Sequence, residues 1–211
     1  MRIEVTQEPI TTLETYASIS IAFEVSSILE VTANGNSPDG FVLTERPLDV
    51  PYLKDYDSIY GEQPPQWAKH FDISNWALFV AWAEGRRIGG ATVAFSTPGL
   101  GMLEGREDLA ILWDIRVSPE ARGQGVGSAL FQMVEAWARA KGCRQLKVET
   151  QNTNVAACGF YARQGCQLRG VKHKAYAELP DEVQLLWYKD LLPQPLGTEN
   201  EAGITQRAWP M

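Results

Sequence analysis

A turn that carries three glycines near the middle of the chain constrains the fold of this 211-residue protein more than any other feature. The turn, residues 122–127 (RGQGVG), follows the apolar run 109–117 (LAILWDIRV), which predicts a buried strand. Residues 125–141 then show apolar side chains at helical spacing, and Gly142 supplies a stop. The sequence therefore predicts a strand, a glycine turn and a helix in direct succession.

Such a turn is suited to hold an anion. Glycine lets the backbone approach a ligand without a Cβ clash, and the first N–H groups of a helix have no intrahelical acceptor. The helix dipole favours negative charge there, and Arg122 adds a cation. A pyrophosphate is the natural ligand. The spacing G-x-G-x-G and the lack of Gly-Lys-Ser/Thr argue against the usual dinucleotide and P-loop fingerprints.

The elements on either side of this turn predict the fold class. The order is three strands, a helix, a strand, a short helix that Asn154 caps, and two closing strands. This order indicates an α/β (α+β) sheet with helices on its faces. Residues 19–33 show apolar spacings of both a helix and a strand, so the sequence leaves their secondary structure open. The other expected strands are 2–6, 76–83, 88–95, 145–150, 166–177 and 183–191, and 10–18 is expected to be helical.

Charge and composition narrow the class of function. The chain has 19 basic and 26 acidic side chains, a formal charge of −7, which argues against nucleic acid as a partner and permits a cationic substrate. No stretch approaches the roughly 20 apolar residues of a membrane span, and no signal peptide is present, so we expect a cytoplasmic protein without a membrane partner. Cys143, Cys158 and Cys166 lack metal-ligand spacing and predict reduced, buried thiols and no metal.

Residues 34–66 form an acidic segment with six acids, two bases and several prolines. The prolines and the Asn-Gly and Asp-Gly pairs predict an irregular, turn-rich structure. Two interpretations stay open: a solvated acidic loop, or a flap that recognises a cation.

Two motifs together resemble the GNAT superfamily of N-acetyltransferases. Arg122, Gly125 and Gly127 meet its Arg-x-x-Gly-x-Gly signature for acetyl coenzyme A, and residues 154–161 look like its Asn-x-x-Ala-x-x-Phe-Tyr helix. The resemblance covers residues 75–191. It implies a mixed, mostly antiparallel central sheet with helices on both faces and a splay between the two central strands.

The resemblance also implies how the chain is organised and where acetyl coenzyme A, the acetyl donor, binds. Residues 1–192 form one acetyltransferase domain, in which 1–74 select the acceptor and 75–191 bind the cofactor, and 193–211 form a flexible tail. The cofactor lies in the splay, with its pantetheine along the strand that holds Ile115. The implied cofactor-binding residues are Ile115, Arg116, Val117, Arg122, Gly123, Gln124, Gly125, Val126, Gly127, Ser128, Asn154 and Ala157.

The implied chemistry is acetyl transfer to an amine, which needs a base for the amine and an acid for the leaving thiolate. Tyr161 matches the family's general acid. Asp114 and Glu149 are the candidate bases, and Asp114 is favoured slightly as base and substrate anchor because it interrupts an apolar strand. Alternation places Asp114 with Leu112 and Arg116 on one strand face, and an ion pair with Arg116 is the structural alternative.

Three short runs look closest to the streptothricin acetyltransferases within the superfamily: 23–25 (FEV), 148–151 (VETQ) and 186–188 (LWY). That resemblance implies a small cationic amine as acceptor. The alternatives are an N-acetyltransferase of protein N-termini or lysines, a non-catalytic acyl-coenzyme A sensor, and a nucleotide-binding regulator. A monomer and a homodimer are both compatible with the sequence.

Overall fold

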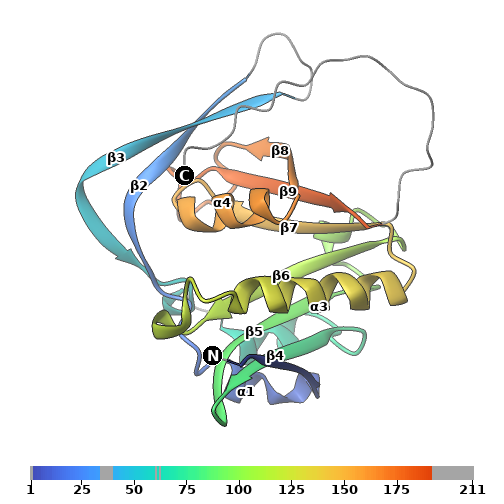
Figure 1. The fold of residues 1–211 in the computed structure, drawn as a ribbon. Coiled ribbons are helices and arrows are strands. Elements are labelled where there is room, and N and C mark those ends of the chain that lie inside the picture. The colour runs from blue at the N-terminus through green and yellow to red at the C-terminus, as the bar shows by residue number, and fades with distance from the viewer. Residues whose placement is uncertain (1, 34–39, 60, 62, 192–211) are drawn as a thin grey trace, which may run out of the picture.

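The computed structural model describes residues 2–33, 40–59, 61 and 63–191. In this part of the chain, helices pack on a seven-stranded sheet, and a two-stranded hairpin forms a separate sheet (Figure 1). The strand order is β1-β4-β5-β6-β7-β9-β8, and only β6 and β7 pair in parallel among the described strands. The predicted mixed, mostly antiparallel sheet is confirmed. The strands are β1 (Glu4–Glu8), β2 (Phe23–Ala33), β3 (Phe41–Lys54), β4 (Ala77–Ala83), β5 (Arg86–Ala94), β6 (Leu109–Val117), β7 (Gln145–Gln151), β8 (Gln167–Lys172) and β9 (Gln184–Asp190).

Helices cover both faces of the sheet, as predicted. On one face α3 and α4 pack over the strands, and on the other α1 and α2 close a cluster of tryptophans. The apolar stripe of α3 is buried at Val126, Leu130, Val134 and Ala138, which is the i, i+4 spacing read from the sequence. The helices are α1 (Leu13–Tyr16), α2 (Trp67–His70), α3 (Val126–Ala140) and α4 (Val155–Arg163).

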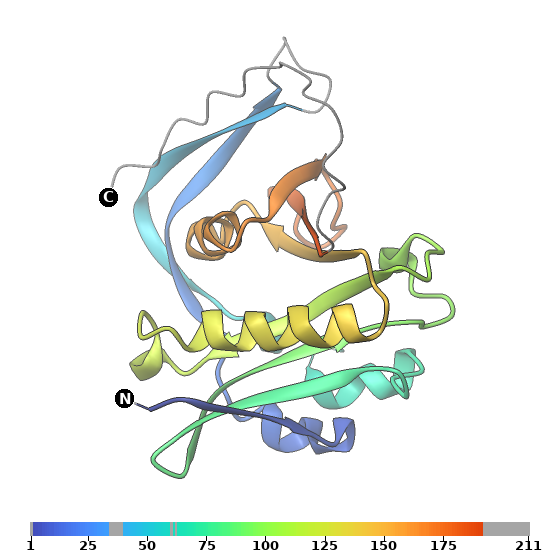
Figure 2. The same ribbon diagram turned by 45° about the vertical axis from the view of Figure 1, so that its right-hand side comes forward.

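The hairpin of β2 and β3 corrects one prediction. The sequence predicts irregular structure for residues 34–66, but 41–54 form a long strand that pairs with β2, and β2 passes beside α4 (Figure 2). Its prolines are tolerated because β3 pairs on one side only, so a missing N–H costs no ladder bond. Residues 48–51 have no partner in β2, so the hairpin bends there. Residues 34–39, with the Asn-Gly turn, lie outside the described part.

Asn152 fastens this hairpin to the main sheet. Its carbonyl accepts from the N–H of Leu29 at 2.9 Å, and its side-chain amide donates to the carbonyl of Leu29 at 3.1 Å. On its other side, the N–H of Asn152 donates to the carbonyl of Val183 at 3.0 Å, and Oδ1 accepts from the N–H of Val183 at 2.9 Å. One buried asparagine thus satisfies two backbone segments as a strand would.

The remaining boundaries differ from the prediction in small ways. The first strand begins two residues later than expected, and the helical stretch 10–18 is a 3₁₀ turn followed by α1. The strand predicted over 166–177 ends at Lys172. The predicted flexible tail, 193–211, lies outside the described residues. No described helix has the length and apolarity needed to cross a bilayer.

Replacing Asn152 by alanine should lower the free energy of unfolding by about 2 to 4 kcal/mol, because a partly buried N–H of Val183 and a buried carbonyl of Leu29 lose their partners. Denaturant unfolding measures the change. The control is Asn75→Ala, which removes an exposed amide bond to Ser96 and should cost less than about 1 kcal/mol. Equal losses in the two variants would contradict the role given to Asn152.

Candidate active site

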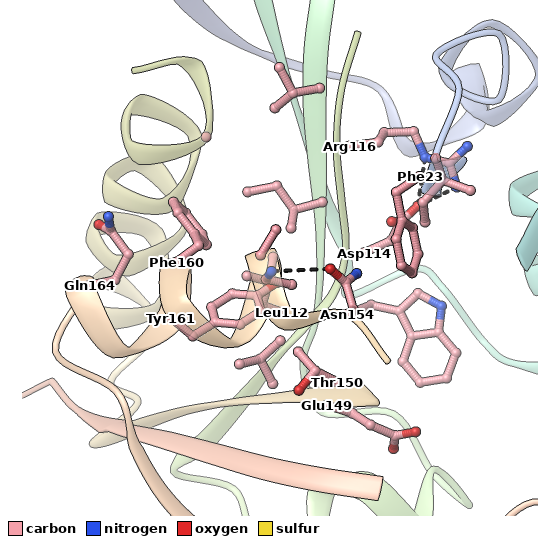
Figure 3. A pocket seen from close by; sticks show the side chains of 18 of the residues that line it. Phe23, Leu112, Asp114, Arg116, Glu149, Thr150, Asn154, Phe160, Tyr161 and Gln164 are labelled. Atoms are coloured by element: carbon pink, nitrogen blue, oxygen red, sulfur yellow. Dashed lines mark hydrogen bonds and ion pairs between the residues drawn. The ribbon is translucent and has the colours of Figure 1, made fainter. Parts of the chain in front are cut away.

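The two central strands separate halfway along their length. Parallel pairing of β6 with β7 ends at Leu112 and Val148, and beyond these residues the strands diverge. A cavity of about 750 Å³ lies between them (Figure 3). The residues after Leu112 keep β5 as their strand partner, so one edge of β6 faces the cavity. This is the splay that the sequence resemblance implies.

A β-bulge at Trp113 decides which side chains enter the cavity. Thr92 of β5 lies opposite Asp114, and Val93 lies opposite Leu112, so Trp113 is the extra residue. Because of this residue the alternation changes face. Leu112 packs in the same core as Ile115 and Val117, whereas Ile111 and Trp113 pack on the opposite face. The prediction that Leu112 shares a face with Asp114 is therefore wrong, and the bulge is the reason.

The glycine turn forms the predicted cradle at the start of α3. Gly123 and Gly125 have φ of 74° and 86°, a region that other residues rarely adopt. The first bond within the helix joins the N–H of Ala129 to the carbonyl of Gly125, so the preceding N–H groups have no intrahelical acceptor. Arg122 donates to the carbonyls of Val117 and Ala22 at 3.0 and 2.8 Å. These groups fit a pyrophosphate.

Helix α4 forms the opposite wall of the cavity. Asn154 caps it, and its Oδ1 accepts from the N–H of Ala157 at 3.1 Å, as the sequence predicted. Both residues line the cavity, together with Phe160 and Tyr161. Gly165, with φ of 81°, follows the end of the helix.

Tyr161 is buried and its ring packs against Phe131 and Phe160. Its hydroxyl has no hydrogen-bond partner among the residues that the structure describes. Burial raises the pKa of Tyr161 well above its ordinary value, and the nearby Cys166 and Asp114 act in the same direction. The hydroxyl therefore stays protonated and is free to donate to a group in the cavity.

The two candidate bases lie in different surroundings. Asp114 pairs with Arg116, whose Nη2 donates to Oδ2 at 2.6 Å, so the structural alternative named above is present. Burial raises the pKa of Asp114, and Arg116 opposes that shift. Glu149 instead accepts from the Tyr176 hydroxyl at 2.6 Å and the Gln184 amide at 2.7 Å, which are both neutral donors.

The structure brings nearly all of the predicted residues to one cavity. Gln124 is the exception: its amide donates to the carbonyl of Glu120 at 2.8 Å, and it does not line the cavity. Arg116 borders the cavity, but its side chain is turned into an ion-pair network. The predicted residues that line the cavity are Asp114, Ile115, Arg116, Val117, Arg122, Gly123, Gly125, Val126, Gly127, Ser128, Glu149, Asn154, Ala157 and Tyr161.

Sequence reasoning missed several residues of the opposite half of the cavity. Phe23, Tyr56 and Asp57, which are far from the glycine turn in sequence, line it together with Trp113 of β6. The density of acids in residues 34–66 was the signal for Asp57, but no local pattern showed which acid faces inward. We call this region the acceptor half.

The three cysteines lie in the described part of the chain, outside any cluster of metal ligands found there. Cys143, Cys158 and Cys166 are free and buried, as predicted. Burial raises the pKa of Cys158 to about 11 and that of Cys166 to about 12, which keeps both thiols protonated. The described residues contain no group of three or more histidine, cysteine or acidic side chains placed to hold a metal ion.

Comparison with known sequences supports the likeness seen in the motifs. Residues 48–166 match the model of the acetyltransferase (GNAT) family. The chain is 28% identical over 170 residues to streptothricin acetyltransferase of Streptomyces lavendulae, which covers 81% of this chain and 84% of that protein. It is also 28% identical over 147 residues to streptothricin acetyltransferase A of Bacillus subtilis, covering 69% and 77%.

Solved structures show the same architecture. A crystal structure of nourseothricin acetyltransferase has a TM-score of 0.70 and 26% identity, and the match covers 91% of this chain and all of that one. Another structure, from Bacillus anthracis and in complex with acetyl coenzyme A, has a TM-score of 0.71 at 22% identity, covering 90% and 99%. Because its sequence identity is low, the match to the second structure is evidence for a shared fold and for nothing more.

Gly125→Glu should weaken coenzyme A binding by roughly 100-fold, because it places negative charge and bulk where a pyrophosphate fits. Calorimetric titration with coenzyme A measures the affinity. Gly125→Ala is the matched control, since it imposes the same strain at positive φ without the charge. A folded glutamate variant that binds coenzyme A as the alanine variant does would contradict this site.

Tyr161→Phe should lower kcat by roughly 100-fold and leave coenzyme A affinity nearly unchanged, because it removes one proton donor from the cavity. The raised pKa gives the sign of the pH dependence: the hydroxyl keeps its proton as pH rises through about 10, the ordinary tyrosine value. The ratio of wild-type to variant kcat should therefore stay constant between about pH 7 and 9.5. A ratio that falls towards one in this range would exclude Tyr161 as the acid.

Proposed function

This chain belongs to the acetyltransferase (GNAT) family, and we propose that it transfers an acetyl group from acetyl coenzyme A to a primary amine of a small cationic acceptor of the streptothricin type. Acetyltransferases of this family use acetyl coenzyme A as donor. One observation carries the proposal: the cavity between the diverging strands β6 and β7 is lined by both family motifs.

The donor half of the cavity fits the cofactor. The free N–H groups at the start of α3 and Arg122 would hold the pyrophosphate. The backbone of Ile115 and Val117 would pair with the pantetheine, and Asn154 would bind the same arm from α4. When bound, acetyl coenzyme A supplies an acetyl group activated as a thioester.

The lining of the acceptor half supports a small acceptor. Tyr56 and Asp57, from the acidic segment 34–66, line it, and no residue of β8 or β9 among those described does so. An enzyme that modifies peptides should instead offer an open groove along these last strands. Lys54 and Tyr56 both contact Glu182, so the loop before β9 is fastened to the end of the hairpin.

Tyr161 is the proposed general acid, and Glu149 is the proposed base. Tyr161 keeps its proton and donates it to the leaving sulfur. Glu149 stands at the end of β7 beside the splay and accepts the proton that the amine must lose, directly or through a water.

The choice of Glu149 over Asp114 reverses the preference from the sequence. Two N–H groups of Arg116 already occupy Asp114, and protonating this carboxylate would weaken a buried ion pair. The donors to Glu149 are neutral, so their hydrogen bonds to this carboxylate weaken less when it gains a proton. Asp114 remains the alternative base, and mutagenesis separates the two.

The organisation of the chain is part of the same proposal. Residues 1–192 form one acetyltransferase domain, in which 1–74 shape the acceptor side. The support is that Phe23, Tyr56 and Asp57 line the acceptor half, and that β1 is hydrogen-bonded to β4 at the edge of the main sheet.

A thiol-release screen tests the function. The purified chain with acetyl coenzyme A should release free thiol with streptothricin, and less with lysine, polyamines, aminoglycosides and N-terminal peptides. Release with peptides alone would favour the protein N-acetyltransferase. Coenzyme A binding without release for any amine would favour the sensor.

Glu149→Gln should lower kcat with the best acceptor by roughly 100-fold, because the amide cannot accept the amine's proton. The control is Glu178→Gln, an exposed acid of the loop before β9, which should keep wild-type turnover. An active Glu149→Gln beside an inactive Asp114→Asn would transfer the role of base to Asp114.

A further inference from the structure

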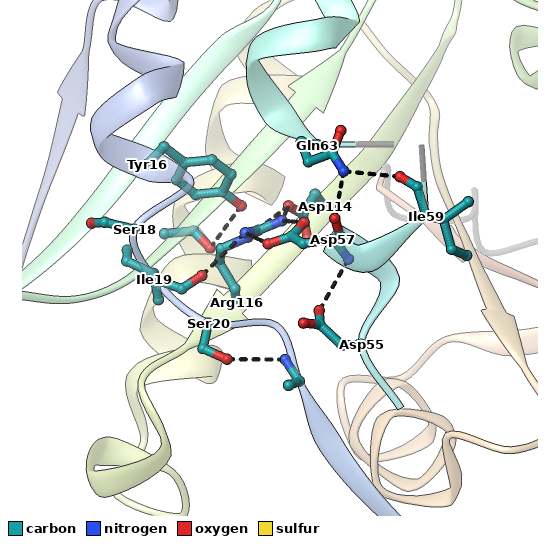
Figure 4. A network of polar contacts seen from close by, with 12 residues as sticks. Tyr16, Ser18, Ile19, Ser20, Asp55, Asp57, Ile59, Gln63, Asp114 and Arg116 are labelled. Carbon is teal, nitrogen blue, oxygen red and sulfur yellow. Dashed lines mark hydrogen bonds and ion pairs between the residues drawn. The ribbon is translucent and has the colours of Figure 1, made fainter. Parts of the chain in front are cut away.

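Arg116 is the centre of a buried charge cluster at the acceptor half (Figure 4). Its side chain is 1% exposed and pairs with Asp114, at 7%, and with Asp57, at 23%. These three residues, which we call the Arg116 cluster, come from the bulged strand β6 and from the turn after β3. The ring of Tyr16 lies beneath the guanidinium, 4.9 Å from its carbon.

Every N–H of the guanidinium is occupied. Nε and Nη2 donate to Oδ2 of Asp114 at 2.9 and 2.6 Å. Nη1 and Nη2 donate to the two oxygens of Asp57 at 2.8 and 3.2 Å, and Nη1 also donates to the carbonyl of Ile19 at 3.1 Å. Since these bonds use all five donors of an arginine, Arg116 has none left for a substrate.

The charges of the cluster do not balance. Two carboxylates share one guanidinium, so one negative charge is in excess when both are ionised. Burial raises the pKa of Asp114, and the charge of Asp57 acts in the same direction. Two other arginines line the cavity: Arg122 donates to backbone carbonyls at the cofactor turn, and Arg163 is exposed at the end of α4. A cation brought by the acceptor would compensate the excess.

Asp57 is the member of the cluster that is most open to the cavity. Asp55 accepts from its backbone N–H at 3.0 Å, and Gln63 donates to its carbonyl, so the turn that carries Asp57 is held from both sides. Arg116 takes one N–H contact on each carboxylate oxygen, and an ionised carboxylate has about four acceptor sites. The rings of Phe23 and Tyr56 border the same half, which favours a cationic guest.

We propose that the Arg116 cluster binds a second, non-reacting cationic group of the acceptor, an alkylammonium or guanidinium, with Asp57 as the specificity-determining contact. This inference rests on the proposed acetyl transfer to a cationic amine. The bound group cannot be the reacting one, because a carboxylate that pairs with an ammonium stabilises its charged form and opposes the loss of the proton. The acceptor therefore carries at least two cationic groups.

Two probe amines of equal length test the subsite. Calorimetry compares 1,5-diaminopentane with pentylamine on the coenzyme A complex of the full chain, at low salt. The wild type should bind the diamine roughly tenfold more tightly than the monoamine. Asp57→Asn should reduce this preference to less than about threefold. Absence of the preference in the wild type, or its persistence in Asp57→Asn, would overturn the proposal.

The matched control is Asp55→Asn, in the same turn. Asp55 does not line the cavity, and asparagine caps the turn equally well, so the preference should stay. Its loss in Asp55→Asn would count against a specific role of Asp57.

A second variant covers the case in which Asp57→Asn fails to fold. Asp57→Glu keeps the charge but moves the carboxylate by one methylene, so 1,4-diaminobutane should become the preferred diamine. An unchanged length preference would overturn the role of Asp57. Because binding is measured without turnover, a diamine preference in a chain that acetylates no amine would keep the subsite and reject only the proposed function.

Discussion

The divergence of two parallel strands is the constraint on which the rest of this structure depends. Hydrogen bonding between β6 and β7 stops at Leu112, and the bulge at Trp113 follows directly. A continuous ladder would have left no space between the strands. The interruption instead exposes backbone groups of β6, opens the cavity, and turns Asp114 and Arg116 away from the core that holds Ile115 and Val117.

Segments distant in sequence are tied to this gap by polar groups rather than by a shared sheet. Asn152 joins the hairpin to the end of β7. Arg116 and Arg122 hold the chain between α1 and β2 through the carbonyls of Ile19 and Ala22. The strand and the turn that serve the cofactor therefore also position the wall that faces the acceptor. Breaking these contacts leaves buried donors and acceptors unpaired, which specifies one arrangement of the wall.

The donor half of the site was predictable because its signals are local. Positive φ at Gly125, the free N–H groups of α3 and the cap at Asn154 each arise within a few residues of sequence. The acceptor half was not, because Asp57 meets Arg116 across 59 residues and only the fold brings them together. The prediction of irregular structure for residues 34–66 was wrong for a related reason. Prolines predict turns locally, but an edge strand with one unpaired side accepts them.

From the sequence alone, two local motifs indicate the family and, through that resemblance, the mostly antiparallel sheet. Periodicity, glycine spacing and capping indicate the order of the elements and the cradle at the start of α3, since these signals act over short distances. Only the tertiary structure decided the face on which Asp114 lies and the charge that surrounds it. A bulge switches the face to which the following side chains of a strand point, and the periodicity of the sequence does not show it. Charge compensation depends on partners that chain folding, and not sequence proximity, supplies.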